Sequence, residues 1–521
     1  MKTTALNVTA QHDPVWTAGF EMEKFSPLTK DISVDVCIVG AGIAGLSTAY
    51  MLARAGRKVA VLDDGTVGGG TTTVTTAHLA NALDDRYYEV ERIHGPEGIR
   101  LAANSHSVAI DRIEQIIGEE KIDCDFQRVD GFLFLGPDQK EELLQRELAA
   151  AERAGLTVER LTRAPLASFN TGPCIRFPRQ GQFHPLKYLA GLAEAITRHG
   201  GQIYTNTHVD KIQGGDESEV QAGKHRVQCD AIVVATNSPI NDLVAIHTKQ
   251  AAYMTYVIGA RVPANSIPKA LYWDMEDPYH YVRLCEGPRQ NSAAAPYDVL
   301  IVGGEDHKTG QADDTQLRHA RLETWARHRF PMIQEVEFVW GGQVLETLDG
   351  LAFIGRNPLD ADNVYVVTGD SGMGMTHGTI AGILLTDLIH GRPNPWADLY
   401  NPSRKPLSAL GSFVQENANV AWQYFDWLTG SEMTLEEIPN GGGAVLRRGL
   451  TKVAVHRDEE GTLHQCSAVC PHLQCIVKWN AAETTWDCPC HGSRFDKQGH
   501  VINGPANQDL PQVETPLESG L

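Results

Sequence analysis

The spacing of hydrophobic positions changes along the chain and predicts three kinds of structure. Near the N-terminus, an apolar run at 34–39 is followed by a helical run at Leu46–Ala55 and a second apolar run at Val59–Leu62. This order predicts a strand, a helix and a strand, the βαβ unit of a parallel sheet. Between residues 246 and 339 polar and apolar positions alternate, which predicts antiparallel strands. From residue 431 onward, short alternating runs separated by turns predict a small all-β module.

A glycine-rich turn joins the first predicted strand to the helix. Gly40, Gly42 and Gly45 form the pattern G-x-G-x-x-G, which allows a tight turn, close approach of the backbone to a pyrophosphate and close packing of helix on strand. The N-terminus of the helix then faces the diphosphate. Asp63, at the end of the second strand, is placed to accept a hydrogen bond from a ribose hydroxyl. The pattern predicts a dinucleotide site; a glycine-rich turn without a nucleotide is the alternative.

Two later segments favour FAD over NAD as the dinucleotide. The apolar strand predicted at Ala231–Ala235 breaks at Thr236, a second strand end that can close over the cofactor. A strand at Val364–Val367 is followed by a glycine-rich turn through Gly372 and Gly374, and then by an apolar helix. A second helix N-terminus directed at the site suits an electron-rich ring that gains negative charge on reduction, as a flavin does.

Residues 31 to about 395 resemble the superfamily of FAD-dependent D-amino-acid oxidases, glycine oxidases and sarcosine oxidases. The segments that carry the resemblance are VGAGIAGLSTAYMLARAGRKVAVLD, QFHPLKYLAGLAEAI, CDAIVVATN and DGLAFIG…VTGDSGMGMTHG. The resemblance implies contacts with each part of FAD, in addition to the strand end at Thr236 and the turn at Gly372. The pyrophosphate is expected at Gly40, Gly42, Ile43, Ala44 and Gly45, the ribose at Asp63 and the adenine near Val209. The flavin is expected near Thr72, Thr76, Ala77, Gly374, Met375 and Thr376. His78 lies where some members of the superfamily carry a histidine bound covalently to the flavin; a structural histidine is the alternative.

A substrate domain lies between the FAD-binding segments in this superfamily. Tyr279, Tyr281 and Arg283 share one face of a predicted strand because alternate residues of a strand point the same way. The resemblance implies that Tyr279 and Arg283 bind a substrate carboxylate, and an exposed strand face with a solvated arginine is the alternative. Hydride transfer from an amine to a flavin needs positioning more than acid–base groups. The absence of a Ser-His-Asp or Cys-His motif is therefore compatible with amine oxidation.

Two short motifs near the C-terminus predict a metal centre. Cys470-Pro-His472 and Cys488-Pro-Cys-His491 have the spacing of a Rieske [2Fe–2S] centre, in which two thiolates bind one iron and two imidazoles bind the other. Zinc is the alternative, although a Cys-x-His pair with one intervening residue is uncommon in tetrahedral zinc sites.

The C-terminal module resembles the Rieske domains of cytochrome bc complexes, with matching segments CPHLQC and CPCHGS. This resemblance implies a disulfide between Cys475 and Cys490 that clamps the two loops, and a proline loop at NGPANQDL that covers the cluster. Ser493 supplies a hydroxyl that can donate to the cluster sulfurs and tune the potential.

The predicted fold class is an α/β FAD-binding domain of the Rossmann-like GR2 type, with an interleaved antiparallel α+β substrate domain and a C-terminal all-β Rieske domain. The chain as a whole resembles bacterial oxidoreductases with this fusion, described as gamma-glutamylputrescine-oxidoreductase-like. The predicted bounds are an N-terminal arm at 1–30, the FAD-binding domain at 31–110, 175–245 and 340–395, the substrate domain at 111–174 and 246–339, a linker with an amphipathic helix at 396–430, and the Rieske domain at 431–521.

Composition and charge argue against two classes of partner. The formal net charge of −20 and the pI near 5.4 argue against nucleic acid and anionic membranes as partners. The N-terminus has no apolar signal region and no apolar run is long enough to span a membrane, so we expect a cytoplasmic protein.

These features together predict an FAD-dependent dehydrogenase that oxidises a small amine or amino acid. Its electrons would pass singly through the Rieske cluster to an external acceptor protein. Two alternatives are an oxidase that uses O2 and has a structural or regulatory Rieske module, and an enzyme whose cluster feeds electrons from a donor protein to the flavin. A ring-hydroxylating oxygenase is disfavoured because no two histidines have the close spacing of its mononuclear iron site.

Overall fold

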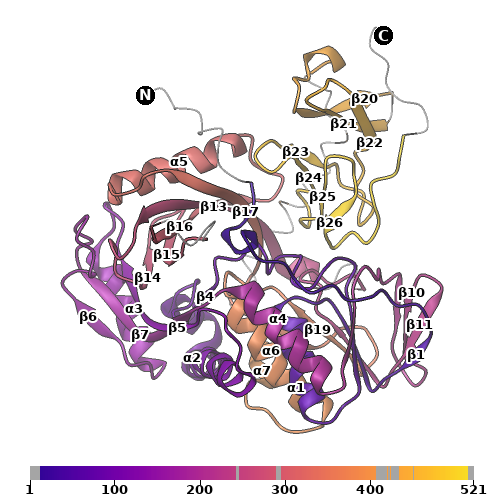
Figure 1. Ribbon diagram of the computed structural model, residues 1–521, viewed down its shortest axis with the longest axis horizontal. Coiled ribbons are helices and arrows are strands. Elements are labelled where there is room, and N and C mark those ends of the chain that lie inside the picture. The colour runs from indigo at the N-terminus through magenta and orange to yellow at the C-terminus, as the bar shows by residue number, and fades with distance from the viewer. Residues whose placement is uncertain are drawn as a thin grey trace.

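The computed structural model describes residues 12–241, 246–288, 295–405, 433–449 and 451–513, together with residues 419, 423 and 427. The amphipathic helix predicted near residues 406–430 lies largely outside the described residues. Trp427 is described, and its indole nitrogen donates to the Gln474 carbonyl of the C-terminal module at 3.0 Å. Figure 1 shows a large body and the smaller C-terminal module, drawn in yellow, above one side of it. No helix in the described part of the chain is long and apolar enough to cross a membrane.

The N-terminal βαβ unit forms the centre of a six-stranded sheet. β2 pairs in parallel with β3 and with β12, and all three strands consist of buried apolar residues, as in sheets covered on both faces. Within this sheet only the edge strand β18 runs antiparallel to its neighbour, β19. The strands in sheet order are β18 (Phe353–Arg356), β19 (Val364–Thr368), β12 (Ala231–Val234), β2 (Val36–Val39), β3 (Val59–Leu62) and β8 (Gln202–Tyr204).

Helix α1 contacts both α4 and α6. α1 begins at Ile43, before the predicted Leu46, because Gly42 is its N-cap. Gly382 on α6 permits close packing, since a Cβ at this position would lie 2.9 Å from the Ser47 backbone. The helices of this region are α1 (Ile43–Arg54), α2 (Tyr87–Glu120), α4 (Pro185–Arg198), α6 (Gly374–Ile389) and α7 (Ala397–Tyr400).

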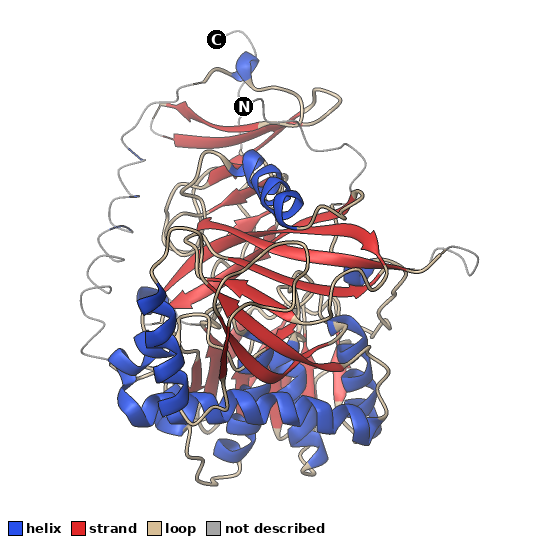
Figure 2. Cartoon of the chain, turned by 90° about the vertical axis from the view of Figure 1, so that its left-hand side faces the viewer, coloured by secondary structure: helices blue, strands red, loops and turns tan. Residues whose placement is uncertain are grey.

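A larger sheet crosses the middle of the molecule, with the helices of the first region gathered at one end (Figure 2). Its strands are antiparallel except for the parallel pair β14 and β5. Helix α5 (Thr315–Arg329) packs on β13 and β16, and α3 (Glu141–Arg153) packs on β7. The strands are β17 (Val336–Thr347), β13 (Gln250–Pro263), β16 (Tyr297–Lys308), β15 (His280–Glu286), β14 (Leu271–Asp274), β5 (Gln127–Phe134), β7 (Cys174–Gln182) and β4 (His78–Leu79), with β6 (Glu159–Leu161) paired to β7.

Three small sheets complete the described fold. One lies beside the six-stranded sheet and consists of β1 (Ile32–Ser33), β11 (His225–Gln228), β10 (Glu219–Ala222) and β9 (Lys211–Gln213). The other two form the C-terminal module, as the sequence predicts: β20 (Gly443–Arg448), β21 (Thr451–Arg457) and β22 (Leu463–Ser467) in one, and β23 (Lys478–Asn480), β24 (Thr485–Asp487), β25 (Arg494–Phe495) and β26 (Val501–Asn503) in the other.

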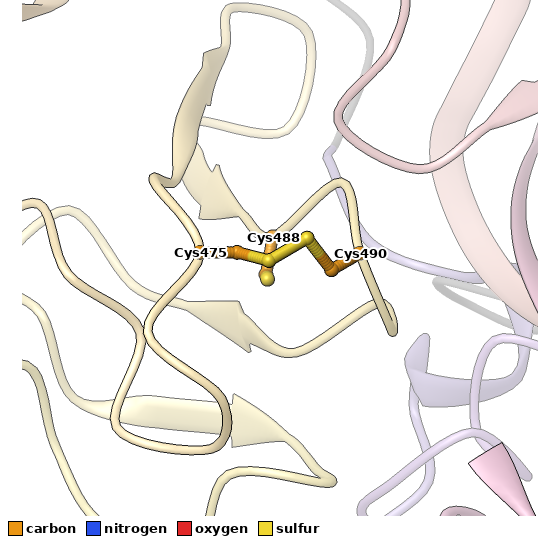
Figure 3. Close-up of side chains that lie close together, drawn as sticks. All are labelled: Cys475, Cys488 and Cys490. Atoms are coloured by element: carbon orange, nitrogen blue, oxygen red, sulfur yellow. A yellow bond between two sulfur atoms is a disulfide. The ribbon is translucent and has the colours of Figure 1, made fainter. Parts of the chain in front are cut away.

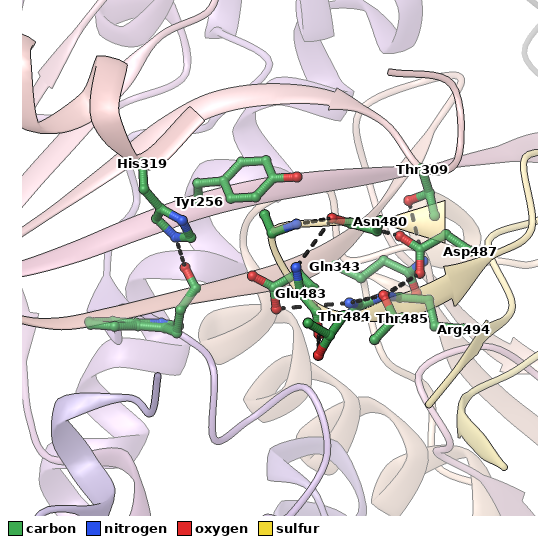
Figure 4. Close-up of polar contacts among 12 residues, drawn as sticks. Tyr256, Thr309, His319, Gln343, Asn480, Glu483, Thr484, Thr485, Asp487 and Arg494 are labelled. Atoms are coloured by element: carbon green, nitrogen blue, oxygen red, sulfur yellow. Dashed lines mark hydrogen bonds and ion pairs between the residues drawn. The ribbon is translucent and has the colours of Figure 1, made fainter. Parts of the chain in front are cut away.

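A buried polar network joins the strands of the second C-terminal sheet (Figure 4). Arg494 donates to Asp487 at 3.1 Å and to Thr485 at 3.2 Å, and Asp487 also accepts from Asn480 at 2.9 Å. Glu483 lies 3.9 Å from the same guanidinium. The network faces Tyr256 and Gln343 of the large sheet, so it stabilises the module on the side that contacts the body.

Replacement of Arg494 by leucine should destabilise the C-terminal module by about 3–5 kcal/mol, because Asp487 would become a buried charge without a counterion. Urea unfolding followed by circular dichroism measures this loss. Arg447→Leu is the control, since Arg447 is exposed and donates only to a nearby backbone carbonyl. Equal losses in the two variants would contradict the prediction.

Candidate flavin and iron–sulfur sites

The turn between β2 and α1 has a shape that requires glycine at two positions. Gly40 has a φ of +106° and donates to the Leu62 carbonyl at 2.8 Å. A Cβ at Gly45 would collide with the Gly40 carbonyl oxygen. No side chain therefore covers the backbone of the turn at these positions, and the turn lies close to α1, as binding of a pyrophosphate requires.

The N-terminus of α1 adds hydrogen-bond donors to this turn. Gly42 caps the helix without a side-chain hydrogen bond. Thr72 accepts a hydrogen bond from the Ile43 amide at 3.1 Å. The Thr72 hydroxyl thus lies at the helix N-terminus, where a phosphate is expected, and the predicted contact of Thr72 with the flavin ring stays a prediction.

Asp63 closes the same turn from the end of β3. Its carboxylate accepts from the amides of Ala41 at 2.6 Å and Gly65 at 2.9 Å. Burial raises the pKa of Asp63 to about 6 in spite of these bonds. Each carboxylate oxygen retains a further lone pair, so Asp63 can also accept a ribose hydroxyl.

A cavity of about 1030 Å³ extends from this turn to the N-terminus of α6. The predicted FAD-contact residues that line it are Gly40, Gly42, Ile43, Ala44, Asp63, Thr72, Thr76, Val209, Thr236, Gly372, Gly374 and Met375. One continuous cavity thus contacts the glycine turn expected to bind the pyrophosphate, the end of β3 at Asp63 and the N-terminus of α6. These features fit the two halves of FAD.

Three predicted contact residues lie beside the cavity without lining it. Gly45 serves the packing of α1, as described above. Ala77 is fully buried, and its carbonyl accepts a hydrogen bond from Arg283 at 2.7 Å. Thr376 bonds to His106 at 2.8 Å. Sequence patterns place such residues in the correct turn but do not indicate which side chain points into the cavity.

The flavin end of the cavity is lined by aromatic and acidic side chains. Tyr279 donates to Asp84 at 3.0 Å, and its ring lies 5.7 Å from that of Tyr281. His78 is hydrogen-bonded to Thr76 at 3.1 Å, and burial lowers the pKa of His78 to about 3, so its ring is neutral. His78 lines the cavity, and a covalent bond to flavin stays a prediction.

Arg283 lies apart from the cavity, in contrast to Tyr279. The guanidinium nitrogen Nη1 donates to the carbonyls of Ala77 at 2.7 Å and of Thr76 and Phe183 at 3.2 Å each. Burial lowers the pKa of Arg283 to about 10, so the group remains charged at neutral pH. This position does not agree with the predicted role of Arg283 in binding a substrate carboxylate, nor with the alternative of an exposed, solvated arginine: Arg283 is buried, lies outside the cavity lining and fixes the turn that carries His78.

Two loops of the C-terminal module bring the predicted cluster ligands together. Cys470 and Cys488 are buried, and the hydrogen bond between the two thiols lowers the pKa of Cys470 and raises the pKa of Cys488. The rings of His472 and His491 meet edge to face, with centroids 5.0 Å apart. Burial lowers the pKa of His491 to about 3, so the imidazole is neutral. Thiolate and neutral imidazole are the forms that bind metal, and this set fits a Rieske cluster.

Cys475 and Cys490 form a disulfide that joins the same two loops, with Cys488 beside it (Figure 3). The predicted pairing is therefore confirmed. Ser493 is fully buried and its hydroxyl bonds to Cys470, which is the contact that its predicted tuning role requires.

Two residues of the large body approach these loops and were not predicted from sequence. His247 is buried, and its ring lies 5.0 Å from that of His472 and 6.1 Å from that of His491. Gln343 on β17 lines the cavity and donates to the Gly492 carbonyl at 2.7 Å. No local motif marks either residue, because both contacts join segments far apart in the chain.

Comparisons with known proteins agree with this geometry. Residues 35–388 match the family model described as DAO, FAD dependent oxidoreductase, and residues 431–514 match the Rieske [2Fe-2S] domain. The chain belongs to the FAD dependent oxidoreductase family. It also carries a Rieske domain, so FAD and a [2Fe–2S] cluster are its cofactors.

Similar proteins share one or both parts of this flavoenzyme. The Bacillus subtilis (strain 168) Rieske 2Fe-2S iron-sulfur protein YhfW is 31% identical over 96% of this chain and 97% of its own length. Gamma-glutamylputrescine oxidoreductase of Escherichia coli (strain K12) is 28% identical, over 70% of this chain and 86% of its own. The crystal structure of glycine oxidase from Geobacillus kaustophilus has the same fold, with a TM-score of 0.59 and 19% identity over 72% of this chain and 99% of that one.

Replacing Cys470 or His491 of this flavoenzyme by alanine should yield protein without bound iron, since each removes a predicted cluster ligand. Iron analysis and visible absorbance measure the loss. Cys466→Ala is the control, because Cys466 is buried in the same core without belonging to the ligand loops. Iron retained in the His491 variant would contradict the assignment.

The affinity of the flavoenzyme for FAD should fall as the pH drops through about 6, because the Asp63 carboxylate loses its charge there and a neutral carboxyl accepts a ribose hydroxyl less well. Flavin fluorescence titrations between about pH 5 and pH 8 test this. Asp63→Asn should weaken the pH dependence, and Asp370, whose pKa is also about 6, accounts for any remainder. Asp64→Asn should retain it, because a hydrogen bond from His208 keeps the pKa of Asp64 below its usual range.

Proposed function

We propose that the protein is an amine dehydrogenase that passes electrons from FAD to its own Rieske cluster and on to an external acceptor. Bound FAD would accept a hydride from the substrate, and the cluster would carry one electron at a time. The observation that carries this proposal is the contact between the two sites. The ligand loop of the cluster touches the wall of the flavin cavity through Gln343 and Gly492.

This contact leaves a short route between the sites. His491 is a predicted iron ligand, Gly492 follows it in the chain, and one hydrogen bond of 2.7 Å leads from Gly492 to the cavity wall. His247 of the large body also lies next to the rings of both ligand histidines, although it does not line the flavin cavity. Purely structural docking has no need to direct the ligand loop at the flavin cavity, so this orientation favours electron transfer.

The lining of the cavity supports an amine as the substrate. Asp84 and Asp370 line it together with Trp273, Tyr279 and Tyr281, and carboxylates and aromatic faces both attract an ammonium group. The similarity to gamma-glutamylputrescine oxidoreductase agrees with an amine substrate.

No arginine that the structure describes near this end offers its guanidinium to a substrate carboxylate. Arg86 lines the cavity, but its nitrogens donate to the carbonyls of Leu83, Asp84 and Asp274. Arg283 is held by backbone carbonyls in the same way. We therefore favour a cationic amine over a simple amino acid.

The residues of the chain would position the substrate and remove its proton. Burial raises the pKa of Asp370 to about 6, so this carboxylate accepts a proton from an ammonium group more readily than an exposed aspartate. Removal of that proton leaves the neutral amine that hydride transfer requires. The hydrogen bond from Tyr279 fixes the Asp84 carboxylate against the turn at Gly372.

Replacing Gln343 by leucine should slow reduction of the cluster after anaerobic mixing with an amine substrate, by about tenfold if the lost contact raises the barrier by about 1.4 kcal/mol. Bleaching of the flavin should keep its rate. Stopped-flow absorbance separates the two steps. Gln311→Leu is the matched control, because Gln311 also donates to the Rieske loop, at the Pro489 carbonyl at 3.0 Å, without lining the flavin cavity.

Three outcomes would contradict the relay. Equal rates of cluster reduction in the Gln343 and Gln311 variants would show that the contact carries no electrons. Formation of peroxide at full rate by a Cys488→Ser variant without a cluster would favour the oxidase alternative. Flavin that stays oxidised with every amine, but is reduced when the cluster is reduced, would favour the reverse flow of electrons.

A further inference from the structure

The cavity that fits FAD has a wall from the Rieske domain. Besides the residues of the large body, it is lined by Val501, Ile502, Asn503, Gly504, Ala506, Asn507, Gln508 and Asp509. We call residues 501–509 the proline loop segment. Figure 1 shows β26, at the start of this segment, on the side of the module that faces the large body.

Direct contacts attach the proline loop segment to the large body. The Asn507 side-chain amide donates to the Val209 carbonyl at 3.0 Å. His208 bonds to the Asn507 backbone and lies 3.7 Å from the Asp64 carboxylate. Gly504 lies against Ser238, whose carbonyl oxygen would be 3.6 Å from a Cβ at that position.

These contacts lie at the end of the cavity formed by β3 and the residues that follow it. Asp63 and Asp64 follow β3, where the ribose of the adenosine half is expected in a G-x-G-x-x-G site. Val209 and His208 lie beside them in the lining of the cavity. The flavin end, near Gly374 and Tyr279, is bordered by other elements. The proline loop segment therefore faces the adenosine half of FAD.

The same segment is bonded to the loop of the iron–sulfur site. The Ala506 amide donates to the Ser493 hydroxyl at 3.0 Å, and that hydroxyl bonds to Cys470, a predicted ligand. Ser493 is fully buried, so no water competes for these bonds. Two hydrogen bonds therefore connect the ligand loop to the wall of the FAD cavity.

We propose that the Rieske domain forms part of the FAD-binding site, with Asn507 and its neighbours holding the adenosine half. Binding of FAD and assembly of the iron–sulfur module then stabilise each other, because a coupling between two sites acts equally in both directions. The inference needs the FAD site but not electron transfer, so it stands or fails separately from the proposed relay.

Asn507→Leu tests the contact in the full chain with its cluster present and its flavin removed. The dissociation constants of FAD and of ADP, which carries only the adenosine end, should rise by about three- to tenfold, the range for one lost hydrogen bond. The affinity for FMN, which lacks that end, should not change. Titration calorimetry measures all three.

Asn440→Leu is the matched control in the same domain. Asn440 also donates its side-chain amide to a backbone carbonyl, that of Glu459 at 3.1 Å, but it does not line the cavity. Its variant should bind FAD and ADP as the unaltered protein does. Unchanged binding in the Asn507 variant, or equal losses in both variants, would overturn the proposal.

A reciprocal measurement follows the cluster instead of the nucleotide. FAD should raise the temperature at which the cluster absorbance is lost, and should raise it less in the Asn507 variant. If Asn507→Leu does not fold, Asn507→Asp preserves the size of the side chain and replaces the donor with a carboxylate that repels the Val209 carbonyl. An equal effect of FAD on cluster loss in the variant and the unaltered protein would overturn the coupling.

Discussion

Docking of the Rieske loop on the large sheet depends on the absence of a side chain at Gly492. This residue has a φ of +80°, and a Cβ there would overlap the Cβ of Ala252. Any other residue would both strain the loop and push it away from β13. Because Gly492 directly follows His491, such a displacement would move a ligand of the cluster. The close approach of the two cofactor sites thus depends on one glycine, just as the approach of α1 to its turn depends on Gly45.

Short-range patterns predicted the cofactors well because their chemistry is local. The glycine turn at Gly40, the Cys-x-His motif at Cys470 and the Cys-x-x-His motif at Cys488 each place their binding groups within a few residues, so spacing alone defines the geometry. The contacts of Arg283, His247 and Gln343 join segments separated by large stretches of chain, and period-two spacing on a strand cannot show what lies opposite a side chain. For the same reason the sequence predicted the flavin-binding turn near Thr72 but not which end of the cofactor this residue faces.

Charge is distributed differently in the two sites. The flavin cavity contains carboxylates whose pKa values burial raises, such as Asp63 and Asp370, so small changes in their surroundings alter their charge near neutral pH. The Rieske loops instead carry a neutral imidazole at His491 and a cysteine, Cys470, with a lowered pKa, which are matched to iron. The first site therefore contains groups that can take up a proton near neutral pH, whereas the second site contains ligands for metal.

The position of His247 limits the directions from which another protein can approach the cluster. This buried residue occupies the space beside the rings of His472 and His491, on the side turned toward the body. A protein that docks from outside cannot use that surface without displacing the module. In the proposed relay, electrons would then enter and leave on opposite sides of the cluster. In that relay, the acceptor would be recognised by the outward surface of the small module.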